Sequence, residues 1–201
     1  MTGIVMATML EAGPFIRGME LAEIPAGPFP VYRGGDTLLA ISGIGKVNAA
    51  MAVAYLACVY SPSQVLNLGA AGCTRAGFSV GEIYHIDRVI EHDRPHLITK
   101  KQRMIAPAVM EGFPLASLAT GDVPVTGSAE RGALARSADL VDMEGAAVVQ
   151  ACARFGLPVY LFKIVTDTPE HEKDADIIRN VKKTSSALFD FYADKIRPRL
   201  A

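Results

Sequence analysis

Three carboxylates stand at the ends of apolar segments in this 201-residue chain. Glu11 follows an apolar run at 3–8, Glu144 opens a helical pattern, and Asp167 ends an apolar run at 158–167. Carboxyl groups can donate or accept protons in catalysis and can hold the hydroxyl groups of a ligand. Each also has a plain structural explanation, because acidic residues stabilise and cap helix N-termini. Their function depends on whether the fold brings them together.

The segments around these carboxylates alternate between short apolar runs and longer helical patterns. This alternation predicts an α/β fold with a parallel or mixed central sheet. The chain has no internal repeat, low-complexity tract or linker, so residues 1–201 are expected to form a single domain. The helix at 46–60 is apolar almost all round and is predicted to be well buried. Strands are predicted at 3–8, 28–34, 37–43, 64–72, 81–93, 113–122 and 158–167, with a further strand-like segment before Glu144. Helices are predicted at 46–60, from about 143, and at about 174–196.

Ligands of such sheets bind beyond the carboxyl ends of the strands. Acidic groups and glycine-rich turns are therefore expected to converge on one rim. The small residues of NLGAAGC either allow close packing or offer a backbone surface on which a flat ring can lie, and the sequence leaves both open. Five segments fall at the rim: the loop reaching Glu11, SGIGK (42–46), NLGAAGC (67–73), ATGDVPV (119–125) and VTD (165–167).

The composition is that of an ordinary globular protein and argues against several partners. Lys and Arg total 20 against 21 for Asp and Glu, so no net charge draws the chain to nucleic acid or to an anionic membrane. No apolar run reaches membrane-spanning length, and the start MTGIVMATML predicts a strand and not a signal peptide. Cys58 and Cys152 lie in apolar helical patterns and are expected to be buried free thiols. A reducing cytoplasm fits these features.

The motif GIGK resembles part of a phosphate-binding loop but fails on spacing. Val47 follows the lysine where a P-loop needs a hydroxyl, and Asn48 stands where a dinucleotide fingerprint needs its third glycine. A tight strand-to-helix turn is therefore the favoured interpretation.

The motif EHDRPH (91–96) brings His92, Asp93 and His96 close together in sequence. Metal binding is one interpretation, but the proline breaks any helix that would align the three as ligands. We expect a solvated loop there and predict no metal site.

Taken together, the motifs resemble the nucleoside phosphorylase and nucleosidase superfamily, specifically its 5′-methylthioadenosine/S-adenosylhomocysteine nucleosidase branch. The resemblance covers most of the chain. It implies a three-layer α/β/α domain with a mixed central sheet, a purine N-glycosidase of methionine salvage, no metal or organic cofactor, and a homo-oligomer of two or more subunits. The markers are ISGIGKVNAA, NLGAAGC, VGEI, ATGD, VDMEGAAVVQACARFGLPV and KIVTD.

The resemblance also implies roles for individual residues. Glu144 matches the glutamate that holds the ribose hydroxyls, and Met143 the methionine that packs on the sugar. Asp167 matches the aspartate that protonates N7 of the departing purine, and Glu11 the glutamate that positions or activates the attacking water. Asp167 has to arrive protonated, which the apolar strand before it would favour by excluding water. The remaining residues expected to bind substrate are Ala70, Gly72, Val123, Pro124, Val125 and Thr166.

Hydrolysis is favoured over phosphorolysis. Phosphorylases of the superfamily need cationic and hydroxyl ligands for phosphate, whereas the matching turn here carries Asn67 and Ala70, and the early loop offers only Arg17. A dianion without charge-assisted donors would bind poorly, and Glu11 would repel it. Water is therefore the expected nucleophile.

Four features depart from the family pattern. Pro124 replaces the aromatic residue that usually stacks on the purine, and Ala70 replaces the usual serine. The segment before 113 is short and lacks a helix that relatives carry. After Asp167 the usual alanine-aspartate pair and the following aromatic residue are absent. The catalytic carboxylates are expected to be retained, while base stacking and tail recognition are altered.

The leading interpretation is a nucleosidase for a 5′-modified purine nucleoside such as methylthioadenosine or adenosylhomocysteine. Futalosine, adenosylhopane, inosine and adenosine are alternative substrates, and phosphorolysis is the alternative reaction. A non-catalytic nucleoside-binding relative is disfavoured because Glu11, Glu144 and Asp167 are all present. An unrelated dinucleotide-binding domain is disfavoured by the missing third glycine.

Overall fold

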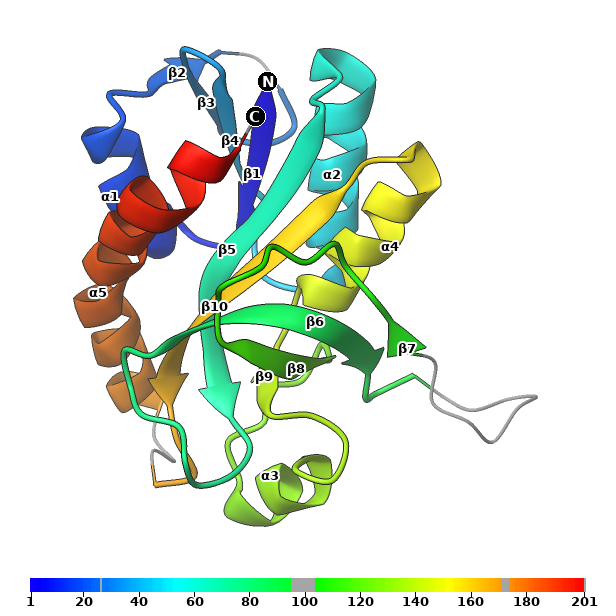
Figure 1. Ribbon diagram of the computed structural model, residues 1–201, viewed down its shortest axis with the longest axis vertical. Coiled ribbons are helices and arrows are strands. Elements are labelled where there is room, and N and C mark those ends of the chain that lie inside the picture. Colours follow the sequence, from blue (N-terminus) through cyan, green and yellow to red (C-terminus); the bar gives the residue numbers. More distant parts are fainter. Residues whose placement is uncertain (26, 95–103, 171–173, 201) are drawn as a thin grey trace.

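The computed structural model describes residues 1–25, 27–94, 104–170 and 174–200. Every strand and helix expected from the sequence is present, and the fold adds α1, β2, β7 and α3 (Figure 1). The strands are β1 (Thr2–Met6), β2 (Ala22–Ile24), β3 (Val31–Gly34), β4 (Thr37–Ile41), β5 (Gln64–Cys73), β6 (Ile83–Glu91), β7 (Met104–Ile105), β8 (Leu115–Thr120), β9 (Leu140–Asp142) and β10 (Val159–Asp167). The helices are α1 (Met9–Gly18), α2 (Lys46–Tyr60), α3 (Ser128–Leu134), α4 (Gly145–Phe155) and α5 (Asp174–Phe191), after which a π-helical turn (Tyr192–Ile196) and a 3-10 turn (Arg197–Arg199) follow.

The strands form one mixed sheet in the order β10-β6-β8-β9-β5-β1-β4-β3-β2, with β7 paired to β6. Strands β4, β1, β5 and β10 run parallel, while β10 and β6 are antiparallel. Because β10 pairs with β5 as well as with β6, the strands β5, β10, β6, β8 and β9 close into a ring. The mixed sheet was expected from the sequence, whereas the closure was not.

Helices cover both faces of this sheet (Figure 1). On one face α1 and α5 pack together, and Phe15, Leu188 and Tyr192 share a core with Ile4 of β1. On the other face α2 and α4 pack together over a second core. The sheet between two helical layers confirms the three-layer α/β/α arrangement.

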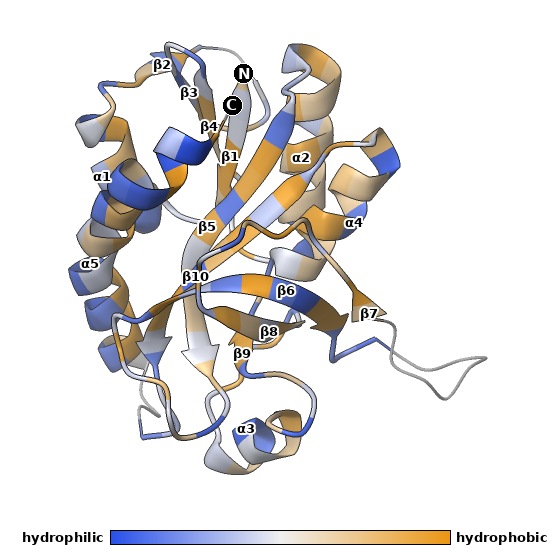
Figure 2. Ribbon diagram, in the orientation of Figure 1, coloured by the Kyte–Doolittle hydropathy of each residue, from blue (hydrophilic) through white to orange (hydrophobic). Residues whose placement is uncertain are grey.

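Helix α2 is less buried than its composition predicts. Its buried side is narrow and consists mainly of alanine and valine, while Val47 and Met51 are 70% and 53% exposed. Figure 2 shows the helix coloured toward hydrophobic along most of its length. The prediction of a well-buried helix is therefore wrong, because one side faces solvent despite its apolar residues. Cys58 lies on that side and is exposed, whereas Cys152 is buried as expected.

The small residues of NLGAAGC belong to strand β5 and do not form the turn that was predicted. Residues 65–72 pair with β10, and the last two residues of β5 pair with β9. The strand therefore keeps its ladder through both alanines and both glycines. The turn comes only after Cys73.

The SGIGK segment is the tight strand-to-helix turn that the sequence predicts. Gly43 and Gly45 have φ angles of 83° and 101°, which only glycine adopts without strain. Lys46 then begins α2, and its ammonium lies 2.6 Å from the Asp93 carboxylate. Asp93 also accepts a hydrogen bond from the Asp122 amide at 2.8 Å, so loop 91–94 is tied to two neighbouring segments.

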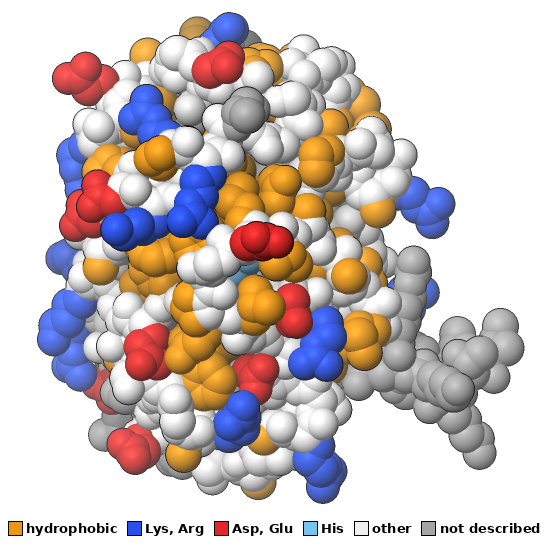
Figure 3. All heavy atoms as spheres, viewed as in Figure 1, with side chains coloured by type: hydrophobic (Ala, Val, Ile, Leu, Met, Phe, Trp, Pro, Cys, Tyr) orange, Lys and Arg blue, Asp and Glu red, His pale blue; other side chains and the backbone are white. Residues whose placement is uncertain are grey.

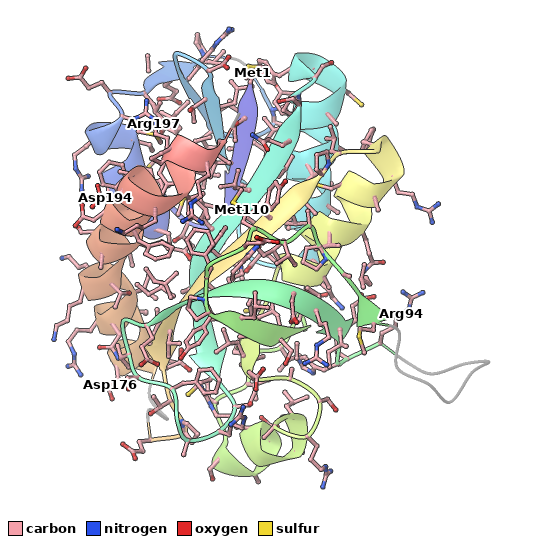
Figure 4. All side chains as sticks on the ribbon, in the orientation of Figure 1. Met1, Arg94, Met110, Asp176, Asp194 and Arg197 are labelled. Carbon is pink, nitrogen blue, oxygen red and sulfur yellow. The ribbon has the colours of Figure 1, made fainter. Side chains whose placement is uncertain are left out.

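The segment after β7 is anchored to the sheet by His85. The His85 Nε2 accepts a hydrogen bond from the Met110 amide at 2.8 Å, so Nδ1 carries the proton and donates to the Leu161 carbonyl at 2.8 Å. Burial lowers the pKa of His85 and favours this neutral ring. Figure 4 labels Met110 near the middle of the molecule, where this segment crosses the sheet. Residues 104–114 contain no helix, as expected, and residues 95–103, which include His96, lie outside the described ranges.

The surface carries charges of both signs. On the face seen in Figure 3, acidic and basic side chains are interspersed among apolar ones.

Within the described residues no group of three His, Cys, Asp or Glu side chains is placed to hold a metal ion. In the same part of the chain, every helix is too short or too polar to cross a membrane.

Candidate active site

A cavity of about 280 Å³ lies where the carboxyl ends of the parallel strands meet. All five rim segments expected from the sequence contribute to its wall. The loop after β1 brings Glu11, the SGIGK turn brings Ile44, and the end of β10 brings Asp167. All ten residues expected to act on or bind a substrate border it: Glu11, Ala70, Gly72, Val123, Pro124, Val125, Met143, Glu144, Thr166 and Asp167.

Glu11 is buried in the first turn of α1, where three donors hold its carboxylate. Thr8 caps the helix and donates to Oε2 from its amide at 3.0 Å and from its hydroxyl at 2.7 Å. The Ala70 amide donates to Oε1 at 2.9 Å. A side chain at Gly69 would place its Cβ 2.8 Å from Oε1, so the glycine makes room for this contact. The sequence left open whether Glu11 lies in the loop after the first strand or at a helix start. The capping box fixes it on the helix, and its carboxylate contacts β5.

Glu144 stands at the N-terminus of α4 and is only 8% exposed. Its Oε1 accepts a hydrogen bond from the Gly45 amide at 2.9 Å, which ties the SGIGK turn to the cavity. Burial, with the nearby Asp142 carboxylate, raises the pKa of Glu144 to about 7. Met143 precedes it at the cavity wall.

A buried ion pair lies behind Glu144. Lys163 of β10 places Nζ 2.8 Å from Oδ2 of Asp142 at the end of β9. Asp142 also accepts from the Thr120 hydroxyl at 2.6 Å and from the Gly145 amide at 2.8 Å. Burial opposes the charge of Lys163, but Asp142, Glu144 and Glu11 together raise the pKa of Lys163 above its ordinary value.

Asp167 differs from its expected surroundings. It is buried, as the apolar strand predicts, but Arg131 of α3 forms an ion pair with its Oδ2. The Thr166 hydroxyl donates to the other carboxylate oxygen at 2.9 Å. The expected exclusion of water is therefore present, but a cation that was not expected reaches the strand end from α3, the helix between β8 and β9 in the chain. A Cβ at Gly72 would lie 2.4 Å from Asp167 Oδ2, so only glycine leaves room for the pair.

The rest of the wall is apolar. Gly72 and the neighbouring alanines of β5 line the cavity, and Val123, Pro124 and Val125 supply aliphatic contacts. Among the described residues of the wall, Arg131 is the only cation, and Asp167 already pairs with it. Five further aliphatic residues line the wall: Leu10, Ile44, Ile177, Ile178 and Val181.

Three charged residues near the cavity, Lys163, Asp142 and Arg131, were not predicted from the sequence. Lys163 could have been recognised from the sequence, since it is the only charged residue inside an otherwise apolar strand. Asp142 had a weaker signal, because it stands two residues before Glu144. Arg131 had none, because SAERGALARS is a short segment of mixed polar and small residues with no clear period.

The arrangement offers one carboxylate held by amide and hydroxyl donors, a second with a raised pKa, and a third paired with arginine. Such a set can orient water, hold hydroxyl groups and stabilise a leaving group that gains electrons. Glu11, Glu144 and Asp167 come from three different elements and meet only in the folded chain.

Comparisons with known proteins agree with this geometry. A family model described as the phosphorylase superfamily matches residues 2–117 and 101–193. A 5′-methylthioadenosine/S-adenosylhomocysteine nucleosidase of Marinomonas sp. (strain MWYL1) is 30% identical over 162 residues, which span 68% of this chain and 70% of that protein.

Solved structures confirm the fold. A nucleosidase mutant of Helicobacter pylori, crystallised with 5′-methylthioadenosine in its active site, matches 98% of each chain with a TM-score of 0.87 and 20% identity. The futalosine hydrolase of Helicobacter pylori strain 26695 matches 97% of each chain with a TM-score of 0.85 and 20% identity. The α/β architecture expected from the sequence is the one these enzymes share.

Proposed function

Because the chain belongs to the phosphorylase superfamily and, within it, to the 5′-methylthioadenosine/S-adenosylhomocysteine nucleosidases, we propose that it hydrolyses 5′-modified adenosines such as methylthioadenosine. It is an N-glycosidase that releases the purine base. The observation that carries the proposal is the meeting of Glu11, Glu144 and Asp167 around one cavity.

Each carboxylate has a separate step in the proposed reaction. Glu144 accepts hydrogen bonds from the ribose hydroxyls, while Met143 packs against the sugar. Glu11, held in place by Thr8 and Ala70, orients a water molecule toward C1′ and takes its proton. The C1′–N9 bond breaks with its electron pair going to the base. Asp167 is ionised while it pairs with Arg131, so it takes up a proton from solvent when the substrate binds. It then delivers this proton to N7, and the base leaves as a neutral molecule.

Water is the proposed nucleophile because the described residues of the cavity wall include no unpaired cation to hold phosphate. Phosphate binding needs charge-assisted donors. Arg131 is the only cation that borders the cavity in the described ranges, and it pairs with Asp167 at the position proposed for the base. Glu11 would repel an anion near the sugar.

The aliphatic wall supports a 5′ substituent of low polarity. Leu10, Ile44, Ile177, Ile178 and Val181 provide hydrocarbon contacts for a thioether tail. We therefore propose methylthioadenosine as the preferred substrate and adenosylhomocysteine, whose tail ends in two charges, as a poorer one.

We further propose that the chain acts as a homo-oligomer in the cytoplasm, in methionine salvage. The exposed apolar side of α2, with Val47, Met51 and Val59, supports an interface between copies. The cysteines of the described residues are free thiols, which suits a reducing compartment.

The test is release of free base from a nucleoside panel, each assayed with and without phosphate. The panel holds methylthioadenosine, adenosylhomocysteine, adenosine, inosine and futalosine. We expect adenine from methylthioadenosine without phosphate. Strict phosphate dependence would make the chain a phosphorylase, and release from futalosine alone would replace the proposed substrate.

A further inference from the structure

Arg131 is a buried cation in the wall of the cavity that the proposed reaction does not use. It comes from α3, is 1% exposed, and reaches across Gly72 to the end of β10. Its NH1 donates to the Cys73 carbonyl at 2.7 Å, and its NH2 donates to Asp167. Its Nε has no hydrogen-bond partner among the described residues. The guanidinium is therefore anchored at two points and keeps spare donors.

The pairing changes what this part of the cavity offers to a purine. Both oxygens of Asp167 already accept hydrogen bonds, one from Thr166 and one from Arg131. A carboxylate alone is an acceptor and matches the amino group of a 6-aminopurine. A guanidinium beside it adds donors at the same place.

The two kinds of purine differ on the edge that carries N7. A 6-aminopurine presents N7 as an acceptor and its amino group as a donor, whereas a 6-oxopurine presents two acceptors, N7 and O6. Because Asp167 faces N7 in the proposed reaction, Arg131 is left to donate to O6, an acceptor that only the 6-oxopurine offers. Arg131 thus has the chemistry that recognises the 6-oxo edge.

We propose that Arg131 determines specificity for the 6-position of the base and lets the enzyme hydrolyse 6-oxopurine nucleosides alongside 6-aminopurine nucleosides. This rests on the proposed function, because it takes the same sugar site and the same bond. Water adds to C1′, the C1′–N9 electron pair goes to the base, and the proton reaches N7 through Asp167. Arg131 keeps its own protons and donates hydrogen bonds only.

A purely structural Arg131 makes a different prediction. If the arginine only neutralised Asp167, its loss would lower turnover of both kinds of nucleoside by the same factor. A contact with O6 lowers turnover of the 6-oxo nucleoside alone. The ratio of kcat/KM for the two substrates separates the alternatives, and it does not depend on the fraction of folded enzyme.

The experiment compares 5′-methylthioadenosine with 5′-methylthioinosine, which differ only at the 6-position. Wild type, Arg131→Met and Arg131→Lys are assayed, with Arg136→Met as the matched control, since Arg136 is exposed beyond the C-terminus of the same helix. We expect wild type to cleave both. Arg131→Met should lower the oxo-to-amino ratio of kcat/KM about tenfold or more, while the control leaves it unchanged.

Two results would overturn the proposal: wild type that releases adenine but no hypoxanthine, or an unchanged ratio in Arg131→Met. Binding of the free bases to wild type and Arg131→Met, measured by calorimetry, gives an independent readout. Weaker hypoxanthine binding with unchanged adenine binding supports the role of Arg131 even if neither nucleoside is cleaved, in which case the proposed function fails on its own. Equal weakening of both bases contradicts it.

Discussion

The ammonium of Lys163 lies 2.8 Å from the carboxylate of Asp142, and both side chains are at most 2% exposed. The pair joins β10 to β9, which are not neighbours in the sheet order. It therefore stabilises the ring of five strands from within and places a positive charge among the cavity carboxylates.

Replacing Lys163 with methionine is expected to destabilise the protein by about 3–5 kcal/mol, because Asp142 is left as a buried charge without its partner. Urea unfolding measures the loss. Lys163→Arg keeps the charge and should cost less. In the double variant Lys163→Met/Asp142→Asn, part of the stability should return, and a double variant no more stable than Lys163→Met would contradict the pairing.

Asp167→Asn is expected to lower kcat/KM for methylthioadenosine by about 10²–10⁴, since the amide has no proton to deliver to N7. The circular dichroism spectrum should remain native. Asp190→Asn, at an exposed position of α5, is the control and should keep full activity. Near-normal turnover in Asp167→Asn would remove Asp167 as the acid.

Glu11→Gln is expected to bind methylthioadenosine but not turn it over. The amide keeps the shape of the side chain but cannot take a proton from water, so kcat should fall by at least about 10². Equilibrium dialysis with the substrate gives the affinity, and single-turnover assays give the rate. Glu23→Gln in β2 is exposed and should behave as wild type. A large loss of affinity with unchanged kcat would place Glu11 in binding and not in catalysis.

The KM for methylthioadenosine should rise as the pH falls through neutrality. The pKa of Glu144 is raised to about 7 by burial and by Asp142, and only the ionised form accepts hydrogen bonds from both ribose hydroxyls. From pH 8 to pH 6 the ionised fraction falls about tenfold, and KM should rise by a similar factor. A 2′,3′-dideoxy analogue, which lacks both hydroxyls, should show no such dependence. A flat KM for the full substrate would argue against the ribose contact.

The same raised pKa affects stability in the opposite direction. Between the ordinary value of 4.5 and about 7, the folded state holds a proton on Glu144 that the unfolded state has released. This contribution is present at low pH and is lost as the pH rises through about 7. Glu144→Gln is therefore expected to raise the free energy of unfolding at pH 8 by about 1–3 kcal/mol relative to wild type, and with it the Tm. At pH 4 the two proteins should differ little. A lower Tm at pH 8 would show that ionised Glu144 stabilises the fold.

The alternation of apolar runs and helical patterns was enough to predict the layers and most strands. Each of these elements buries an apolar face long enough for its pattern to be recognised in the local sequence. The short strands β2 and β7 and helix α3 were missed because seven residues or fewer carry no clear period. Helix α2 was predicted to be well buried because almost all its residues are apolar. Only one side of it packs on the protein, and Val47 and Met51 on the other side are exposed.

The residues that were predicted from the family resemblance to bind or act on the substrate all border the cavity. Glu11, Glu144 and Asp167 stand at recognisable element ends, so their convergence followed from the topology of the sheet. The contact of Arg131 with Asp167 was not predictable, since it depends on how a short helix lies across Gly72. That contact is a property of tertiary packing and leaves no pattern in the local sequence.

The place of β10 in the ring has a consequence for how the protein is made. Among the described residues it is the strand farthest along the chain, yet it lies between β5 and β6. On the ribosome, β5 waits for seconds with an open edge, because synthesis adds about 5–20 residues per second. Such an edge can pair with other nascent chains, so chaperone protection should matter most in that interval. The carboxylate of Asp167, the proposed acid, arrives with the strand that closes the ring, so a nascent chain without β10 lacks this group.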